Sequence, residues 1–155
     1  MTTGRKNINH ILIIKEPNNK RFFLLASDCC SLGRNNDNDI IVKDKQVSRY
    51  HATFLKKTLK NFEEQIWIYD GDLKQKKKSS NGLKINKKLY TNYCLKKGDC
   101  ILIGHNVTLQ YYQFTEETLA LLKVITIAKQ NSKSSSQASQ NKFRRQTSIL
   151  TNVVS

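Results

Sequence analysis

The sequence predicts an all-β protein built as a β-sandwich. Three observations support this: about ten short runs of alternating or β-branched residues, turn residues between consecutive runs, and no helical pattern before residue 115. The chain has 155 residues, of which 38% are hydrophobic. That length is sufficient for one ordinary domain with a real core.

Each expected strand is bounded by a turn signal. The first, Ile8–Lys15, contains an Ile-Leu-Ile-Ile run and stops before Glu16-Pro17-Asn18-Asn19. The others are expected at Arg21–Ala26, Cys30–Arg34, Asp39–Val42, His51–Lys57, Gln65–Tyr69, Gly82–Ile85, Lys88–Tyr90, Cys100–Ile103 and Thr108–Phe114. They are separated by loops or turns at Asn35–Asn38, Asp44–Arg49, Gly71–Asn81, Asn86–Lys87 and Lys97–Asp99. Gly33, inside one of these strands, is expected to mark a bulge or a tight approach of the backbone.

The pattern changes at Thr115, which can cap a helix that begins with Glu116-Glu117 and continues to Ala128. Residues 130–142 are mostly Ser, Gln, Asn and Lys, a composition that favours disorder. We therefore predict three parts: a β-sandwich domain over residues 1–114, a helix over residues 115–129 and a flexible basic tail over residues 130–155.

The net charge of +15 indicates an anionic partner, such as nucleic acid, an acidic membrane surface or a phosphorylated protein. The segment from Glu116 onward contributes +4, so the β domain itself carries +11. Much of the excess is lysine, which AT-rich coding can produce without any function. No apolar run reaches the roughly 20 residues that cross a bilayer. We expect a soluble cytoplasmic protein without a membrane partner, or a stromal protein if an AT-rich plastid genome encodes it.

The chemistry-bearing residues do not assemble an enzyme. Four cysteines (Cys29, Cys30, Cys94 and Cys100) form no Cys-x-x-Cys pair and are expected to be buried thiols. Three histidines are scattered, no glycine-rich nucleotide loop is present, and no nucleophile, base and acid occur together. We therefore expect no enzymatic activity, no metal and no cofactor.

Three polar clusters lie on expected loops. They are Gly33-Arg34, then Ser48-Arg49-Tyr50-His51, then Ser80-Asn81-Gly82. Together they supply guanidinium, hydroxyl and carboxamide groups, which are the donors that bind a tetrahedral oxyanion such as a phosphate ester. Each cluster alone is weak evidence for a binding site, because most surface arginines are simply solvated and Asn-Gly is a common turn. Their joint occurrence predicts an anion-binding site.

The order and spacing of these clusters resemble a forkhead-associated domain. The resemblance covers residues 8–114 and rests on Gly33-Arg34, Asp39-Ile40, Val47-Ser48-Arg49-Tyr50-His51-Ala52, Trp67-Ile68-Tyr69-Asp70, Ser80-Asn81-Gly82, Asn86, Gly98-Asp99 and Ile103-Gly104. It implies an eleven-stranded β-sandwich whose loops at one end bind phosphothreonine peptides. It also implies a phosphopeptide-binding adaptor or regulator in Ser/Thr kinase signalling, with phosphothreonine-containing proteins as partners.

The resemblance assigns roles by position. Arg34 and Ser48 are expected to bind the phosphate directly, Arg49 and Ser80 to assist, and Asn81 to hold the peptide backbone. Three further residues are expected to be structural at the site: Gly33, His51 and Gly82.

Two segments depart from the family pattern or extend it. The loop before Asn81 is long and carries four lysines between residues 74 and 78, which suggests a preference for acidic residues after the phosphothreonine. A solvated charged loop is the alternative. In the tail, Arg144-Arg145-Gln146-Thr147 fits the motif of a basophilic kinase, so Thr147 is a candidate phosphosite that could occupy the Arg34 site in the same chain. An unmodified basic tail is the alternative.

A different class of function also fits the charge. A basic, nucleic-acid-binding protein related to transcription would use Tyr111, Tyr112 and Phe114 as stacking residues. These three residues alternate along an expected strand, however, and core packing explains them equally well.

Overall fold

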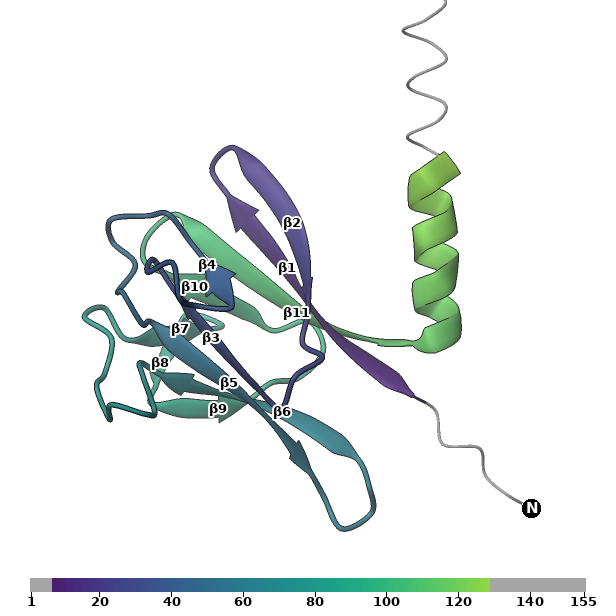
Figure 1. The fold of residues 1–155 in the computed structure, drawn as a ribbon, viewed down its shortest axis with the longest axis horizontal. Helices are drawn as coiled ribbons and strands as arrows, with labels where there is room; N and C mark the ends of the chain where they lie inside the picture. The colour runs from purple at the N-terminus through teal and green to yellow at the C-terminus, as the bar shows by residue number, and fades with distance from the viewer. Residues whose placement is uncertain (1–6, 129–155) are drawn as a thin grey trace, which may run out of the picture. The chain divides into compact units, whose positions relative to one another are not determined.

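The computed structural model describes residues 7–128, and eleven strands in this range form two sheets (Figure 1). One sheet has six strands in the order β2-β1-β11-β10-β7-β8, and the other has five in the order β4-β3-β5-β6-β9. Their bounds are β1 Ile8–Glu16, β2 Asn19–Leu24, β3 Cys29–Gly33, β4 Ile40–Ile41, β5 Ala52–Thr58, β6 Glu64–Asp70, β7 Leu83–Ile85, β8 Lys88–Tyr90, β9 Asn92–Cys94, β10 Cys100–Ile103 and β11 Val107–Thr115. The predicted all-β sandwich is confirmed.

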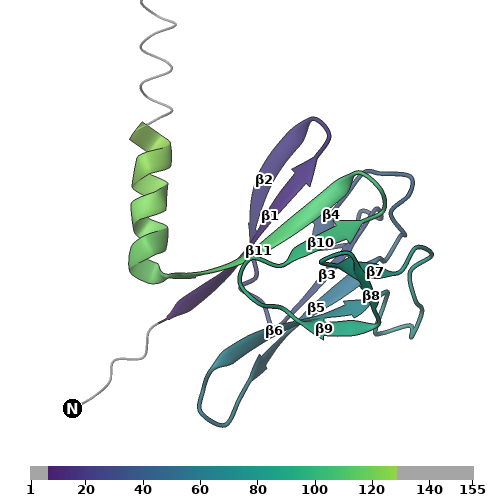
Figure 2. The ribbon, with the colours of Figure 1, turned by 180° about the vertical axis from the view of Figure 1, so that it is seen from behind.

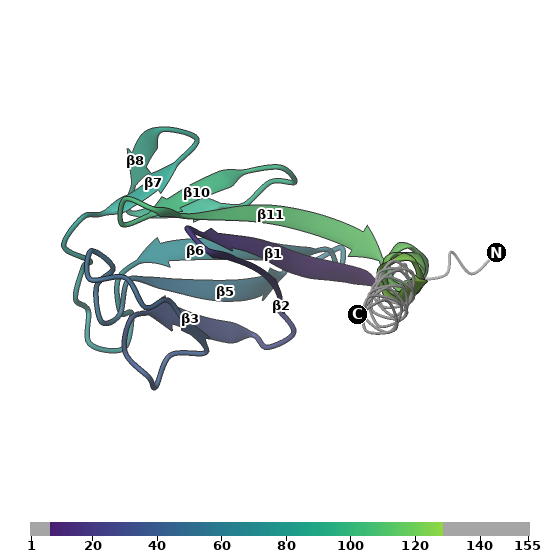
Figure 3. The same cartoon turned by 90° about the horizontal axis from the view of Figure 1, so that it is seen from above.

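The two sheets enclose one hydrophobic core. Alternate residues of β1 and β11 point inward, among them Leu12, Ile14 and Leu109, which are fully buried. Phe54 and Ile68 belong to the same buried cluster from the five-stranded sheet. Figures 1 and 2 show the two layers from opposite sides, and Figure 3 separates β10 and β11 from β3 and β5. Burial of these inward side chains stabilises the scaffold by roughly 1.5–3 kcal/mol for each large one.

Strand register brings three loops to one end of the sandwich. Leu32 near the end of β3 pairs with Ala52 at the start of β5, and Ala52 pairs with Asp70 at the end of β6. Three loops therefore leave the five-stranded sheet at the same end of its strands (Figure 1): the β3–β4 loop (residues 34–39), the β4–β5 loop (residues 42–51) and the β6–β7 loop (residues 71–82). These loops carry the three polar clusters of the sequence.

The structure differs from the sequence-based prediction at β9. Asn92–Cys94 has only three residues and no alternating pattern, so nothing in the sequence singled it out. It forms a strand because Trp67, Ile68 and Tyr69 of β6 offer it an edge to pair with. This pairing is a long-range contact that local sequence does not encode.

The prediction of buried thiols is wrong for most of the cysteines. All four cysteines are free, but only Cys30 is buried, whereas Cys29 is exposed and Cys94 and Cys100 are partly exposed. Consecutive residues of a strand point to opposite faces, so Cys29 and Cys30 cannot both enter the core. Burial raises the pKa of the Cys30 thiol.

Residues 116–128 form an α-helix, which confirms the short helix expected after Thr115. The sandwich up to Thr115 and the helix of residues 116–128 belong to separate units. Among residues 7–128, no helix is both long enough and apolar enough to cross a membrane. The predicted tail, residues 130–155, lies outside the described residues.

A buried polar network links β1 and β11 inside the core. The Tyr111 hydroxyl and Nδ1 of His10 are hydrogen-bonded over 2.6 Å, and the hydroxyl accepts from Nε2 of Gln113 over 3.1 Å. Nε2 of His10 lies 3.5 Å from the Glu64 carboxylate. Burial lowers the pKa of His10 and raises the pKa of Tyr111 to about 12, so both groups are neutral in the network at pH 7.

Replacement of Tyr111 by Phe tests this network. We expect Tyr111→Phe to lower the free energy of unfolding by about 1–3 kcal/mol, because Nδ1 of His10 loses its hydrogen-bond partner where water is excluded. Tyr112→Phe is the matched control, since Tyr112 is partly exposed on the opposite face of the same strand, and it should cost less than about 0.5 kcal/mol. Urea unfolding followed by the fluorescence of Trp67 measures both. Equal losses in the two variants would contradict the assignment.

Candidate functional site

Gly33 and Arg34 lie where β3 turns into the β3–β4 loop. Gly33 is buried, and a Cβ atom there would collide with the carbonyl oxygen of Arg49 and lie 2.7 Å from the carbonyl carbon. Only glycine permits this close approach of two backbones. The expected tight approach at Gly33 is therefore present, and it joins the loop of Arg34 to the loop of Arg49.

Backbone hydrogen bonds fasten these two loops together. The Arg34 amide donates to the Ser48 carbonyl over 3.0 Å, and the Asn35 amide donates to the Arg49 carbonyl over 3.3 Å. The buried Asn38 carboxamide donates to the carbonyls of Arg49 and Asn35 over 2.8 and 3.0 Å. Arg34 and Ser48, which are 14 positions apart in sequence, are thus held side by side.

The third loop joins through the Ser48 hydroxyl. The Ser80 amide donates to Oγ of Ser48 over 2.9 Å, and Nδ2 of Asn81 donates to the Gln46 carbonyl over 2.8 Å. Ser48 Oγ accepts here, so its own proton remains available for a further acceptor. The structure therefore brings Arg34, Ser48, Ser80 and Asn81 to one place.

His51 lies directly beneath this place and is fully buried. Its Nδ1 accepts a hydrogen bond from the Ser48 amide over 3.1 Å, while its own amide donates to the Leu32 carbonyl. Burial lowers the pKa of His51, and the Gly82 backbone and the Asp70 carboxylate act in the opposite direction. Neutral His51 keeps the Nδ1 lone pair that orients the Ser48 backbone.

The same geometry argues against covalent catalysis by Ser48. The Nδ1 lone pair of His51 is used by the Ser48 backbone amide, and the Ser48 hydroxyl oxygen is bonded to Ser80. A nucleophile needs a base within hydrogen-bond reach of its hydroxyl, and His51 makes no such bond. Among the described residues, no group of three or more His, Cys, Asp and Glu side chains is positioned to hold a metal ion.

At this end of the sandwich the aspartates have hydrogen-bond donors within the protein, whereas the cations have no carboxylate partners among the described residues. Eight cations on the three loops are exposed, and no carboxylate of residues 7–128 lies within 4.0 Å of any of them: Arg34, Lys43, Lys45, Arg49, Lys74, Lys76, Lys77 and Lys78. The aspartates are instead bound by neighbouring donors, as Asp39 is by the Ser31 amide and hydroxyl over 2.7 and 2.9 Å. This hydrogen bonding lowers the pKa of Asp39. The end of the sandwich therefore offers free cationic donors to an anion.

Two residues at the site were not predicted from the sequence. Lys43 places its ammonium beside the Asn36 carboxamide and 3.5 Å from the Arg34 carbonyl, which adds a third cation near Arg34. Tyr50 donates to the Asp37 carboxylate and accepts from Asn35, so it is a second tie between the β3–β4 and β4–β5 loops. Tyr50 belongs to the second polar cluster, but local sequence does not indicate its partners on the β3–β4 loop.

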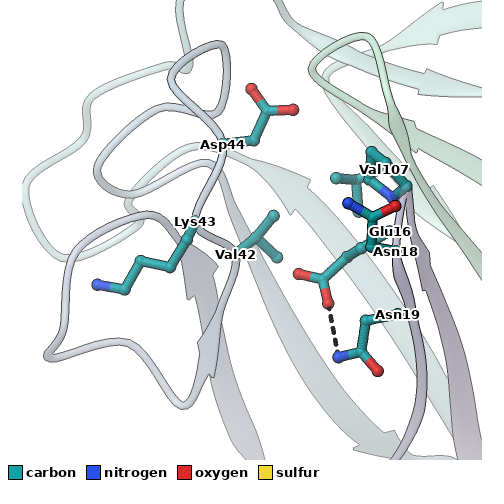
Figure 4. Close-up of a pocket in the computed structure, with 8 residues that line it drawn as sticks. Glu16, Asn18, Asn19, Val42, Lys43, Asp44 and Val107 are labelled. Carbon is teal, nitrogen blue, oxygen red and sulfur yellow. Dashed lines mark hydrogen bonds between the residues drawn. The ribbon is translucent and has the colours of Figure 1, made fainter.

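A groove of about 340 Å³ lies between the β1–β2 turn and the start of the β4–β5 loop. Figure 4 shows Val42 and Val107 at the groove, whereas the Lys43 side chain points to the other side of the chain. Glu16 on the groove wall is already bonded to Asn19 over 3.3 Å. None of the five predicted binding residues lines this groove, so it is a separate feature.

Comparison with known proteins identifies the domain. The family model of the forkhead-associated (FHA) domain matches residues 30–104, which include every residue of the three polar clusters. The chain belongs to the FHA-domain family. The Slr1951 protein from Synechocystis sp. has a similar structure, with a TM-score of 0.62 and 35% sequence identity over 66% of this chain and 96% of that one.

Two further relatives place the domain in context. A solved FHA domain with phosphothreonine-dependent interactions has a TM-score of 0.55 and 22% identity over 67% of this chain and 95% of that chain. The uncharacterized protein sll1895 of Synechocystis sp. is 34% identical over 100 residues, which is 64% of this chain. The match spans only 14% of the length of that relative.

The close approach at Gly33 can be tested by adding one methyl group. Gly33→Ala should lower the free energy of unfolding by at least about 3 kcal/mol, because the new Cβ atom meets a backbone that cannot move aside. Gly98→Ala is the control: Gly98 has φ +90° and open space around it, so only about 1–2 kcal/mol of backbone strain is expected. Chemical denaturation measures both. A Gly33→Ala protein as stable as the wild type would show that the two loops do not meet as described.

Proposed function

We propose that this FHA domain binds phosphothreonine-containing segments of partner proteins and serves as an adaptor or regulator in Ser/Thr kinase signalling in the cytoplasm. The observation that carries the proposal is the cradle formed by three loops, in which the Ser80 amide and the Arg34 backbone are both bonded to Ser48. Donors from separate loops converge there, and the neighbouring carboxylates are already occupied. The phosphothreonine-dependent interactions of a structurally similar FHA domain support the same function.

Each residue has a specific role in this proposal. Arg34 and the free proton of the Ser48 hydroxyl contact the phosphate, and Arg49 and Ser80 assist from adjacent positions. Asn81 is oriented by its bond to Gln46 and uses its remaining amide groups to hold the ligand backbone. Gly33, His51 and Gly82 shape the loops that carry these groups.

The energetics suit a reversible signalling interaction. A phosphoryl group carries about −1.5 to −2 charges at pH 7. Each charge-assisted hydrogen bond contributes about 1.5–3 kcal/mol, and such bonds are not additive. Three or four of them support a dissociation constant near 1 μM, which corresponds to about −8 kcal/mol.

Removal of the Arg34 guanidinium tests the proposal directly. Arg34→Ala should weaken a phosphothreonine peptide by about 10- to 100-fold, because at least one charge-assisted bond is lost. Lys97→Ala removes one cation from the turn before β10, away from the three loops, and should leave affinity within about twofold. Isothermal titration with phosphorylated and unphosphorylated forms of one peptide measures the effect. Equal binding of the two forms by the wild type would refute the function.

The nucleic-acid alternative gives a different result in the same titration. Tyr111 is fully buried and cannot stack on a base, whereas Tyr112 and Phe114 stack on each other with centroids 5.9 Å apart. Binding of a nucleic acid releases counterions, so its affinity falls steeply with salt concentration. Tight binding of an oligonucleotide with a steep salt slope, and no binding of phosphopeptides, would favour the alternative.

We also propose that phosphorylated Thr147 competes for the cradle. Thr147 lies outside the described residues, and its Arg144-Arg145 context supports modification by a basophilic kinase. Full-length protein phosphorylated at Thr147 should bind an external phosphopeptide at least about tenfold more weakly, because a tethered ligand has a high effective concentration. Thr147→Ala protein treated with the same kinase is the control and should keep full affinity. Unchanged affinity after phosphorylation of Thr147 would exclude this competition.

A further inference from the structure

The β6–β7 loop contains a folded turn rather than a loose connection. The amide and carbonyl groups of Asp72 and Lys77 bond to each other over 2.8 and 3.1 Å. The Asp72 carboxylate accepts from the amides of Lys74 and Gln75 over 2.8 and 3.3 Å. We call residues 72–78 the lysine turn, because four of its seven residues are lysines.

Gly71 fixes where the lysine turn sits. Its φ is +81°, and a Cβ atom there would collide with the Lys77 carbonyl oxygen and lie 2.7 Å from Cα of Lys78. The Gly71 amide donates to the His51 carbonyl over 2.8 Å. The turn is thus anchored to the residue that lies beneath the phosphate cradle.

The far end of the turn leads directly into the cradle. Ser79, which follows Lys78, donates its hydroxyl to the Asp70 carboxylate over 2.5 Å, and the next amide, that of Ser80, binds Ser48. Two peptide units separate Lys78 from Ser80, so their Cα atoms are at most about 7 Å apart. Residues of an extended ligand are spaced by about 3.3 Å. Side chains close to a bound phosphothreonine are therefore within reach of the turn.

The lysines of the turn have no carboxylate partner among residues 7–128. Lys74, Lys76, Lys77 and Lys78 are exposed, and no carboxylate of the described residues is within 4.0 Å of their ammonium groups. The one acid in the turn, Asp72, is bonded to backbone amides of the turn itself. A rigid backbone that holds like charges close together favours an external anion that relieves their repulsion.

We propose that the lysine turn recognises a second negative charge in the ligand, close to the phosphothreonine. This inference rests on the proposed function and specifies its substrate class: phosphothreonine segments rich in acidic residues or carrying a second phosphorylated residue. A carboxylate and a phosphate ester provide the same chemistry for an exposed ammonium group, and they differ in charge. The turn acts mainly on specificity and on the rate of association, because exposed ion pairs are weak and screened by salt.

The test uses the full chain and three phosphothreonine peptides that differ only near the phosphosite: one with neutral neighbours, one with Asp and Glu neighbours, and one with a neighbouring phosphoserine. We expect the wild type to prefer the acidic and doubly phosphorylated peptides by about tenfold at low salt. Lys76→Gln, Lys77→Gln and Lys78→Gln, combined in one variant, should reduce that preference to about twofold or less. Titrations at several salt concentrations give affinities and slopes.

A matched control separates local recognition from net charge. Lys84→Gln, Lys87→Gln and Lys88→Gln remove the same charge from exposed positions on β7, β8 and the turn between them. This control variant should keep the wild-type preference. A wild type without preference, or equal loss of preference in the two triple variants, would overturn the proposal. Displacement of the acidic peptide by a single-stranded oligonucleotide of equal charge at equal concentration would also overturn it in favour of a general polyanion surface.

These outcomes are distinct from failure of the proposed function. If no peptide binds better when its threonine is phosphorylated, or if Arg34→Ala binds all three peptides as the wild type does, the phosphothreonine site itself is wrong. If phosphorylation and Arg34 matter but neighbouring acids do not, only the lysine turn is misassigned.

Discussion

The contact between the Gly33 backbone and the Arg49 carbonyl is the constraint on which the rest of the site depends. A side chain at residue 33 would separate the β3–β4 and β4–β5 loops, because its Cβ atom would occupy the position of that carbonyl. With the loops together, Asn38 can bond to both of them, and Arg34 can bond to Ser48. The relative position of Arg34 and Ser48, two of the proposed ligand-binding residues, therefore follows from one backbone approach.

The electrostatics of the site come from the selective neutralisation of acids. Asp39, Asp44 and Asp70 accept hydrogen bonds from nearby amides or hydroxyls, and these bonds stabilise the loop conformations. The eight exposed cations on the three loops have no carboxylate of residues 7–128 within 4.0 Å. Loops whose acids hold the backbone and whose cations lack carboxylate partners in the described residues present a positive surface that is already ordered before a ligand arrives.

The sheets provide most of the stability of the domain, whereas the loops at one end carry the proposed recognition groups. Most of the buried hydrophobic cluster comes from the two sheets, with Val42 and Val47 added by the β4–β5 loop, and the loops at this end carry the polar groups. Tyr50 with Asp37 and the mutual bonds of Asp72 with Lys77 stiffen loops that would otherwise lose entropy on binding. In our proposal, the lysine turn sets ligand preference without any contribution to the core.

The sequence by itself determined the fold class, the family and most of the strands. Alternation and turn residues are local signals, and the spacing of Gly33-Arg34, Ser48-Arg49 and Ser80-Asn81 is distinctive enough to identify the FHA pattern. The short β9 strand was not predicted, because three residues without alternation carry no local signal. The exposure of Cys29 was mispredicted because the face of a residue is set by sheet packing.

Only the tertiary structure decided which groups meet. The bonds from Ser80 to Ser48 and from Tyr50 to Asp37 join residues on different loops, and their geometry depends on sheet register and not on sequence neighbours. Lys43 likewise reaches Arg34 only because both loops leave the same sheet edge. Local composition fixes what each loop can donate or accept, whereas long-range pairing fixes where those groups converge.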